Sequence, residues 1–353
     1  MKRQNFTFQS ATGVCTIAAS CYSPDRTAGG GCADISGAVG SNANPVVTNS
    51  AGGDPAGSNA IDTDPAVIDP AETVLVINHG MAEHQERYLG FITFLTEHGI
   101  TVYMHDMANH GMSNENLRDG GWFGERDGYR GLVDDLRIMV LRARAEHPGA
   151  RLIVMGHSMG SFLCRLYTSW YPDNPFDGAI YMGTGGPNPA AGTGLAAASV
   201  IAKLKGKKHK SKTMDKLAFG SYGKRFEHRT AFDWLTRDQE IVDRYVSDPY
   251  CGFLFTVQGM HDLVQCNKES NEPKWFKDVP KDLSILLVSG AEDPVGDYGK
   301  GIDDVAAKLR AAGHTNVTEK LYAGDRHEIL NELNKEEVMN DILQWIEQVK
   351  PGR

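Results

Sequence analysis

The sequence lacks any run of about 18 apolar residues, the length that a membrane-spanning helix requires. Its start, MKRQNFTFQS, contains basic residues, but no apolar stretch follows them as it would in a secretory signal. The chain also lacks an excess of basic residues, because its formal net charge is -9. Proteins that bind the phosphates of nucleic acids need clustered Lys and Arg. We therefore expect a cytoplasmic protein that binds no nucleic acid.

Paired cysteine motifs are missing as well. The six cysteines show neither C-x-x-C pairs nor a dense framework; they are Cys15, Cys21, Cys32, Cys164, Cys251 and Cys266. This spacing favours reduced thiols that serve mostly in packing. A bridge from Cys15 to Cys21 or to Cys32 is the alternative.

Aromatic residues are absent from residues 25–70, where Gly, Ala, Ser, Asn, Asp and Pro predominate. Without large apolar side chains such a segment has little to bury. We predict a flexible insertion there, and the sequence leaves its role open. Residues 1–24 precede it and show approximate alternation around a Ser-Ala-Thr-Gly turn, which predicts a β-hairpin.

Short apolar runs alternate with longer segments of helical period from residue 72 onward. The runs are residues 73–77, 101–105, 151–155, 178–182, 283–289 and 318–322. This alternation is typical of an α/β fold with a mostly parallel central sheet and helices on both of its faces. We assign residues 71–183 and 283–353 to this core. Residues 184–282 break the alternation and are predicted to be an inserted helical lid, placed where such sheets bind ligands.

The sequence RLIVMGHSMGSFLCRLYTSW contains G-x-S-x-G between a buried-type strand and a helix. In this context the motif predicts a nucleophile elbow, a sharp turn that projects the hydroxyl of Ser158 into a cleft. A serine hydroxyl needs a base, and that base needs a carboxylate to orient it. His327 and Asp293 follow in the expected order, each just after a strand. Glu292 and Asp297 lie in the same loop as Asp293 and are interpreted as solvated charges.

The sequence NHGMAEHQERY follows the first buried strand of the core. His79 and His84 are five positions apart, roughly 140° around a helix, so they could not bind one metal ion from a single helical face. The alternative is half of an oxyanion hole, in which the backbone N–H groups of Met81 and Met159 stabilise the tetrahedral intermediate. His79 would order the loop. No metal site or cofactor is expected.

Five segments together resemble the α/β-hydrolases of the monoglyceride lipase and lysophospholipase group, which is also grouped with the serine aminopeptidase-like hydrolases. The segments are HGMAEHQERY, DMANHGMS, GHSMG, SGAEDPVG and GDRHEIL, in this order. The resemblance implies an α/β-hydrolase fold and ester hydrolysis. It also implies that Glu83 and Arg87 contact the polar head of the substrate; a buried pair that braces the loop is the alternative. These lipases carry a second histidine three residues after the catalytic one, where this chain has Leu330.

The predicted lid contains GLAAASVIAKLKGKKHKSK, an apolar stretch followed by lysines. Such a helix could contact an anionic membrane surface, or it could be a lid helix with a solvated basic tail. Six aromatic residues of the lid could line an acyl pocket or form its core: Phe219, Phe226, Phe232, Trp234, Phe253 and Phe255. The remaining histidines without a metal-like pattern are interpreted as structural or surface residues: His110, His157, His228, His261 and His314.

The sequence thus predicts a serine hydrolase of lipid-like carboxylic esters that uses Ser158, Asp293 and His327. The same residues would also allow amide or peptide hydrolysis. A non-catalytic ligand-binding protein on a hydrolase scaffold is the other alternative, since a shared fold does not guarantee chemistry. The expected ligand is a small lipid-like ester, and no protein partner is implied. Peripheral membrane contact is the alternative to a purely cytoplasmic location.

Overall fold

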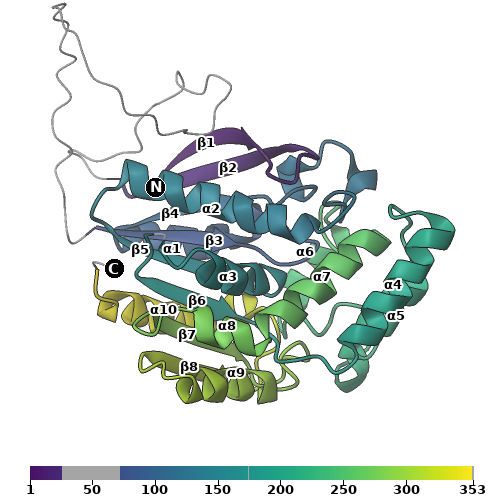
Figure 1. Cartoon of the computed structure of the whole chain (residues 1–353). Helices are drawn as coiled ribbons and strands as arrows, with labels where there is room; N and C mark the ends of the chain where they lie inside the picture. Colours follow the sequence, from purple (N-terminus) through teal and green to yellow (C-terminus); the bar gives the residue numbers. More distant parts are fainter. Residues whose placement is uncertain (26–71, 174, 352–353) are drawn as a thin grey trace, which may run out of the picture.

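Among the residues that the structure describes, eight strands form one sheet in the order β1-β2-β4-β3-β5-β6-β7-β8 (Figure 1). A computed structural model describes residues 1–25, 72–173 and 175–351. The strands are β1 (Lys2–Gln9), β2 (Thr16–Ser23), β3 (Thr73–Asn78), β4 (Ile100–His105), β5 (Arg151–His157), β6 (Gly178–Met182), β7 (Ser284–Gly290) and β8 (Val317–Tyr322). The β1–β2 and β2–β4 pairs are antiparallel and the remaining pairs are parallel. The predicted mostly parallel sheet is confirmed, and β1 and β2 pair with each other as antiparallel strands at its edge.

Strand β3 shows how the sheet separates two apolar cores. All six of its residues are buried. Because side chains alternate between the two faces of a sheet, Val74 and Val76 enter one core and Leu75 and Ile77 enter the other. The continuous apolar runs of the sequence reflect this burial on both faces.

Helices cover both faces of the sheet (Figure 1). The Val74 face packs against α2 (Gly128–Glu146), α3 (Met159–Trp170) and α9 (Lys300–Ala311), and the opposite face packs against α1 (Leu89–Glu97) and α10 (Lys335–Gln348). The apolar positions of α2 recur at helical spacing and are buried: Leu132, Leu136, Val140 and Ala143. The helical periodicity therefore identified the buried side of α2.

The chain between β6 and β7, residues 183–283, is here called the β6–β7 segment. It contains α4 (Ala191–Lys205), α5 (Lys212–Phe219), η4 (Tyr222–Arg225), α6 (Gln239–Ser247), α7 (Val257–Ser270) and α8 (Pro273–Asp278). Helices α4 and α5 lie at one end of the molecule (Figure 1). By contrast, α7 and α8 add Met260, Cys266 and Trp275 to the core on the Val74 face.

Cys21 is disulfide-bonded, whereas Cys15, Cys164, Cys251 and Cys266 are free. The expectation of reduced thiols is therefore confirmed for these four and wrong for Cys21. A Cys15–Cys21 bridge is also excluded, because Cys15 is free. The Cys15–Cys32 bridge is excluded for the same reason. Cys32 itself lies outside the described residues, as does the predicted insertion apart from Asp25.

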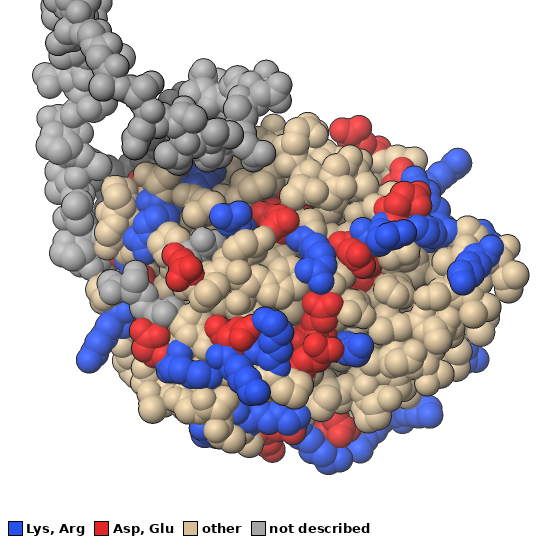
Figure 2. Space-filling view, viewed as in Figure 1, with Lys and Arg blue, Asp and Glu red and all other residues tan. Residues whose placement is uncertain are grey.

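No helix among the described residues is long and apolar enough to cross a membrane. On the face shown in Figure 2, acidic and basic side chains are intermixed.

Candidate active site

Ser158 lies at the sharp turn between β5 and α3. Its φ of 53° and ψ of -121° fall in a region that residues with a side chain rarely adopt. Its N–H donates to the carbonyl oxygen of Met182 (2.9 Å). A Cβ atom on Gly156 would lie 2.2 Å from the carbonyl oxygen of Gly160, and a Cβ on Gly160 would lie 2.3 Å from that of Asn78. Both positions of the motif therefore require glycine, because a side chain at either one would collide with the backbone.

The loop after β3 closely approaches Ser158. A Cβ atom on Gly80 would lie 3.1 Å from the Cβ of Ser158. Met81, the next residue, lines the same cavity as Ser158. Among the described residues, no carbonyl or side chain accepts a hydrogen bond from the N–H of Met81 or Met159. Both donors are therefore available, as an oxyanion site requires.

His79 and His110 order this loop. His79 Nδ1 lies 2.8 Å from the carbonyl oxygen of Gly80, and its Nε2 accepts from the N–H of Met107 (2.9 Å). His110 Nε2 accepts from the N–H of Ala82 (3.2 Å). Burial lowers the pKa of His110 to about 3, so its imidazole is neutral and can accept this bond. Because both ring nitrogens of His79 are engaged, the interpretation of His79 as a residue of loop architecture agrees with these contacts.

His327 and Asp293 form a buried pair. His327 Nδ1 lies 2.9 Å from Asp293 Oδ2, and the two side chains are 2% and 0% exposed. Asp293 also accepts from Ser289 Oγ (2.8 Å) and from the N–H of Val295 (2.8 Å). The carboxylate is therefore fixed by three donors from the end of β7, the loop after it, and His327. This arrangement can fix the orientation of the imidazole.

Two aromatic rings hold the imidazole of His327. The ring of His157 lies 4.7 Å from it and that of Trp234 lies 5.1 Å from it, centroid to centroid. The N–H of His327 donates to the carbonyl oxygen of Trp234 (3.4 Å). Since Trp234 belongs to the β6–β7 segment, this segment helps to position His327.

Ser158 and His327 both line a cavity of about 820 Å³. Its apolar lining includes Phe162, Phe219, Phe232, Phe253, Met260 and Leu263. Four of the six aromatic residues considered for an acyl pocket line it: Phe219, Phe232, Trp234 and Phe253. Phe255 is instead packed in the core, and the ring of Phe226 lies under Arg326.

Glu83 is buried next to Gly80, with which it shares a hydrogen bond. Its Oε1 accepts from the N–H of Gly80 (2.6 Å) and from the hydroxyl of Tyr88 (2.9 Å), and it lies 3.1 Å from His157 Nδ1. Its Oε2 accepts from Arg87 (2.6 Å). Burial opposes ionisation of Glu83, but the hydrogen bond to His157 and the charge of Arg87 hold its pKa well below the usual range.

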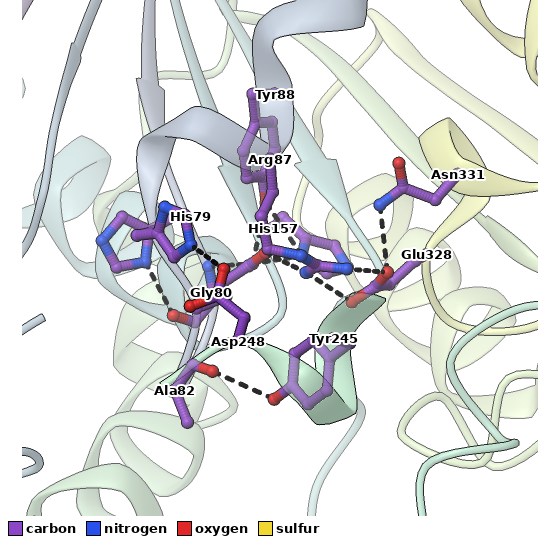
Figure 3. Close-up of polar contacts among 12 residues, drawn as sticks. His79, Gly80, Ala82, Arg87, Tyr88, His157, Tyr245, Asp248, Glu328 and Asn331 are labelled. Atoms are coloured by element: carbon purple, nitrogen blue, oxygen red, sulfur yellow. Dashed lines mark hydrogen bonds and ion pairs between the residues drawn. The ribbon is translucent and has the colours of Figure 1, made fainter. Parts of the chain in front are cut away.

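Arg87 lies between two carboxylates (Figure 3). It donates to Glu83 and, through two parallel bonds of 2.7 and 2.6 Å, to Glu328. Its guanidinium also lies over the ring of Tyr245, 4.7 Å from the centroid. Glu83 and Arg87 therefore form a buried network that includes His157 and Glu328. These last two partners were not predicted from the sequence, although Glu328 directly follows His327 and His157 directly precedes Ser158.

The chain matches the family described as serine aminopeptidase, S33, over residues 69–334. It is 29% identical over 292 residues to the monoacylglycerol lipase of Mycolicibacterium smegmatis, covering 81% of this chain and 89% of the relative. Human monoglyceride lipase is 24% identical over 290 residues, covering 78% and 83%. A thermostable carboxyl esterase from Bacillus coagulans, solved in complex with glycerol, is similar in structure with a TM-score of 0.81 at 25% identity, covering 99% of both chains.

The sheet, the covering helices and this structural similarity define an α/β-hydrolase. The chain belongs to the serine aminopeptidase family, S33, and is a hydrolase of the serine type. The resemblance stated from the five sequence segments is therefore confirmed.

Proposed function

We propose that this protein hydrolyses carboxylic esters of lipid-like substrates through an acyl-enzyme on Ser158. The observation that carries this proposal is that Ser158, in its strained turn, and His327, which is paired with the buried Asp293, line one mainly apolar cavity. Asp293 faces Nδ1 of His327, so Nε2 is the nitrogen left to act on the serine proton.

In the first half of the reaction, the Oγ of Ser158 forms a bond to the ester carbonyl carbon as its proton moves to His327 Nε2. The backbone N–H groups of Met81 and Met159 stabilise the negative carbonyl oxygen of the tetrahedral intermediate. The carbon–oxygen bond to the alcohol then breaks, and His327 returns the proton to the departing oxygen. Asp293 stabilises the imidazolium that forms in between.

In the second half, His327 takes a proton from water while the water oxygen attacks the acyl carbon. The bond to Ser158 breaks, its Oγ regains the proton from His327, and the fatty acid leaves. This cycle needs no redox step.

The apolar lining of the cavity suits an acyl chain, and the relatives named above are lipases of monoglycerides. We infer that monoacylglycerols or lysophospholipids supply the ester. Leu330 stands where such lipases carry a second histidine, and it is buried in the apolar cluster on the α1–α10 face of the sheet. Recognition of the alcohol must therefore come from other residues.

Replacement of Ser158 by Ala tests the proposal directly. We expect Ser158→Ala to abolish hydrolysis of p-nitrophenyl acyl esters and labelling by a fluorophosphonate probe, with an unchanged circular dichroism spectrum. Unchanged turnover would overturn the proposal. A chain-length series of monoacylglycerols, lysophospholipids and simple esters then identifies the substrate class.

The family description makes peptide hydrolysis the competing activity. Matched ester and aminoacyl-amide substrates with the same acyl group separate the two. We expect the ester to be preferred because the mainly apolar lining of the cavity suits a lipid-like alcohol better than a polar peptide amide as the departing group. A preference for the amide would indicate that the protein is an aminopeptidase and not an esterase.

Helices α4 and α5 are proposed to cover the cavity and to contact lipid surfaces. Large apolar side chains on their outer surfaces are exposed: Val200 (56%), Leu204 (78%) and Leu217 (81%). Lysines flank them, as interfacial helices require. Lys207 and Lys208 instead pair with Glu125 and Asp119 of the protein itself, which leaves Lys203, Lys205 and Lys212 for an anionic surface.

A further inference from the structure

Three side chains with metal-ligating atoms come together beside the loop that follows β3. His84 lies two residues after the left-handed Ala82, Asp248 caps the C-terminal end of α6, and Cys251 follows three residues later. One ligand atom of each lies within 4.8 Å of the others. His84 Nε2 is 2.9 Å from Asp248 Oδ2. The cluster takes no part in the proposed reaction.

We propose that His84, Asp248 and Cys251 bind a divalent transition-metal ion of the zinc class. A nitrogen, an oxygen and a sulfur ligand form a set that Zn²⁺ accepts, with water at the fourth position. Bonds of about 2.0–2.3 Å place tetrahedral ligand atoms about 3.3–3.8 Å apart. Small side-chain rotations therefore suffice to close the site. The side chains of His84 and Asp248 are 12% and 30% exposed, which gives an ion access from solvent.

The surroundings of the cluster preorganise its ligands. Asp248 Oδ1 accepts from the N–H of Tyr250 (2.8 Å), which leaves Oδ2 directed at His84. The N–H of Cys251 donates to the carbonyl oxygen of Asp248 (3.0 Å), so a tight turn fixes these two residues relative to each other. The ring of Tyr250 packs edge-on against that of His84. Such outer contacts orient metal ligands.

The chain around the cluster connects it to the cavity. The N–H of Gly252, next to Cys251, donates to the carbonyl oxygen of Ala82 (3.0 Å), and Tyr245 donates to the same oxygen (3.0 Å; Figure 3). A bound ion would strengthen the connection between the Met81 loop and the β6–β7 segment, which the His84–Asp248 contact already makes in part. Any effect of the ion on turnover rests on the proposed function, whereas binding of the ion does not.

Binding must release the thiol proton of Cys251 to solvent, because only the thiolate ligates.

Cobalt titration of the metal-free full-length protein tests the site. Added Co²⁺ should give a thiolate-to-cobalt absorption band that saturates at one ion per chain and disappears when Zn²⁺ is added. Cys251→Ser should abolish the band, and His84→Gln and Asp248→Asn should each weaken binding by about tenfold or more. Cys15→Ser is the matched control, because Cys15 is a free and partly exposed cysteine; it should leave the band unchanged.

Thermal unfolding gives an independent measurement. Zn²⁺ should raise the Tm of the wild-type protein and of Ser158→Ala equally, and it should not raise that of Cys251→Ser. A band that persists in Cys251→Ser would show that another cysteine binds the ion, and a Tm that does not respond to Zn²⁺ in the wild-type protein would show that His84 and Asp248 form an ion pair only; either result would overturn the proposal. The Ser158→Ala background separates this result from failure of the proposed hydrolysis.

Discussion

Arg87 and Glu328 face each other through two parallel hydrogen bonds, although 241 positions separate them in the chain. The pair connects the short helix η1 (Gln85–Tyr88) to the residue that follows His327. A change at Arg87 therefore affects the loop that contains Met81 and the segment that contains His327 at the same time.

Removing the charge of Arg87 should be strongly destabilising. Arg87→Met leaves the buried carboxylates of Glu83 and Glu328 without their cation, and breaking a buried ion pair costs about 3–5 kcal/mol. Urea unfolding measures this loss. Arg244→Met is the control, because Arg244 and Glu240 form an exposed pair (73% and 82%) that contributes about 0.3–0.5 kcal/mol. A loss below about 1 kcal/mol in Arg87→Met, together with a raised KM, would instead favour a contact with the substrate head.

The loop after β7 offers three carboxylates, and a substitution in each identifies the one that orients His327. Asp293→Asn should lower kcat by about 10³–10⁴-fold, because the amide holds the imidazole in the wrong tautomer. Glu292→Gln and Asp297→Asn should keep nearly full activity, since neither carboxylate contacts His327 among the described residues. A large loss in either control variant, with an active Asp293→Asn, would contradict the assignment.

The strands and the main helices could be predicted because the buried apolar residues of each form a regular pattern along the sequence. The run at residues 73–77 is apolar throughout because both faces of β3 are covered. Strand ends could not be placed from the sequence: β5 continues through Gly156, which has low strand propensity, and His157. Both residues are held by pairing with β6. Tertiary hydrogen bonds determine those ends.

The polar network could be predicted only in part. The spacing of Glu83 and Arg87 allowed an internal pair, but Glu328 joins it from a distant segment that only the folded sheet brings close. His157 likewise occupies the variable position of G-x-S-x-G, and nothing in that motif requires it to contact Glu83. Partners that are far apart in the chain leave no local periodicity to detect.

The start of α3 lies so close to the end of β3 that one methyl group added at Gly160 should disrupt the turn at Ser158. Gly160→Ala would place its Cβ 2.3 Å from the carbonyl oxygens of Asn78 and His79, so the turn at Ser158 must shift. We expect loss of activity and a lower Tm. Gly90→Ala in α1 is the control: its Cβ meets no atom within 4 Å, and the unfolding free energy should change by less than about 1 kcal/mol or increase. An active, stable Gly160→Ala would contradict the close approach.

Exposed leucines should determine binding to lipid surfaces. Leu204→Ser and Leu217→Ser together should reduce sedimentation with anionic phospholipid vesicles severalfold, because each removes a side chain that can enter the interface. Turnover of a short, soluble ester should not change. Leu333→Ser is the control, since Leu333 is similarly exposed (68%) but lies outside α4 and α5. Equal vesicle binding by all variants would exclude this surface.

The Glu83–His157 contact predicts two opposite pH dependences of stability. The pKa of folded Glu83 lies well below its usual range, so its contribution is complete above about pH 4.3 and is lost as the pH falls through the folded value. The pKa of His157 is raised, because the hydrogen bond and charge of Glu83 outweigh its burial. Its contribution is therefore complete below about pH 6.5 and is lost as the pH rises through the folded value.

Thermal unfolding of Glu83→Gln and His157→Asn across pH measures both effects. At pH 6 each variant should be less stable than the wild-type protein, with Glu83→Gln losing about 3 kcal/mol or more. The deficit of Glu83→Gln should shrink as the pH falls below about 4, and that of His157→Asn should shrink as the pH rises above about 7. Deficits that stay constant across this range would mean that the pair does not ionise as a unit and that the two residues stabilise the loop through packing alone.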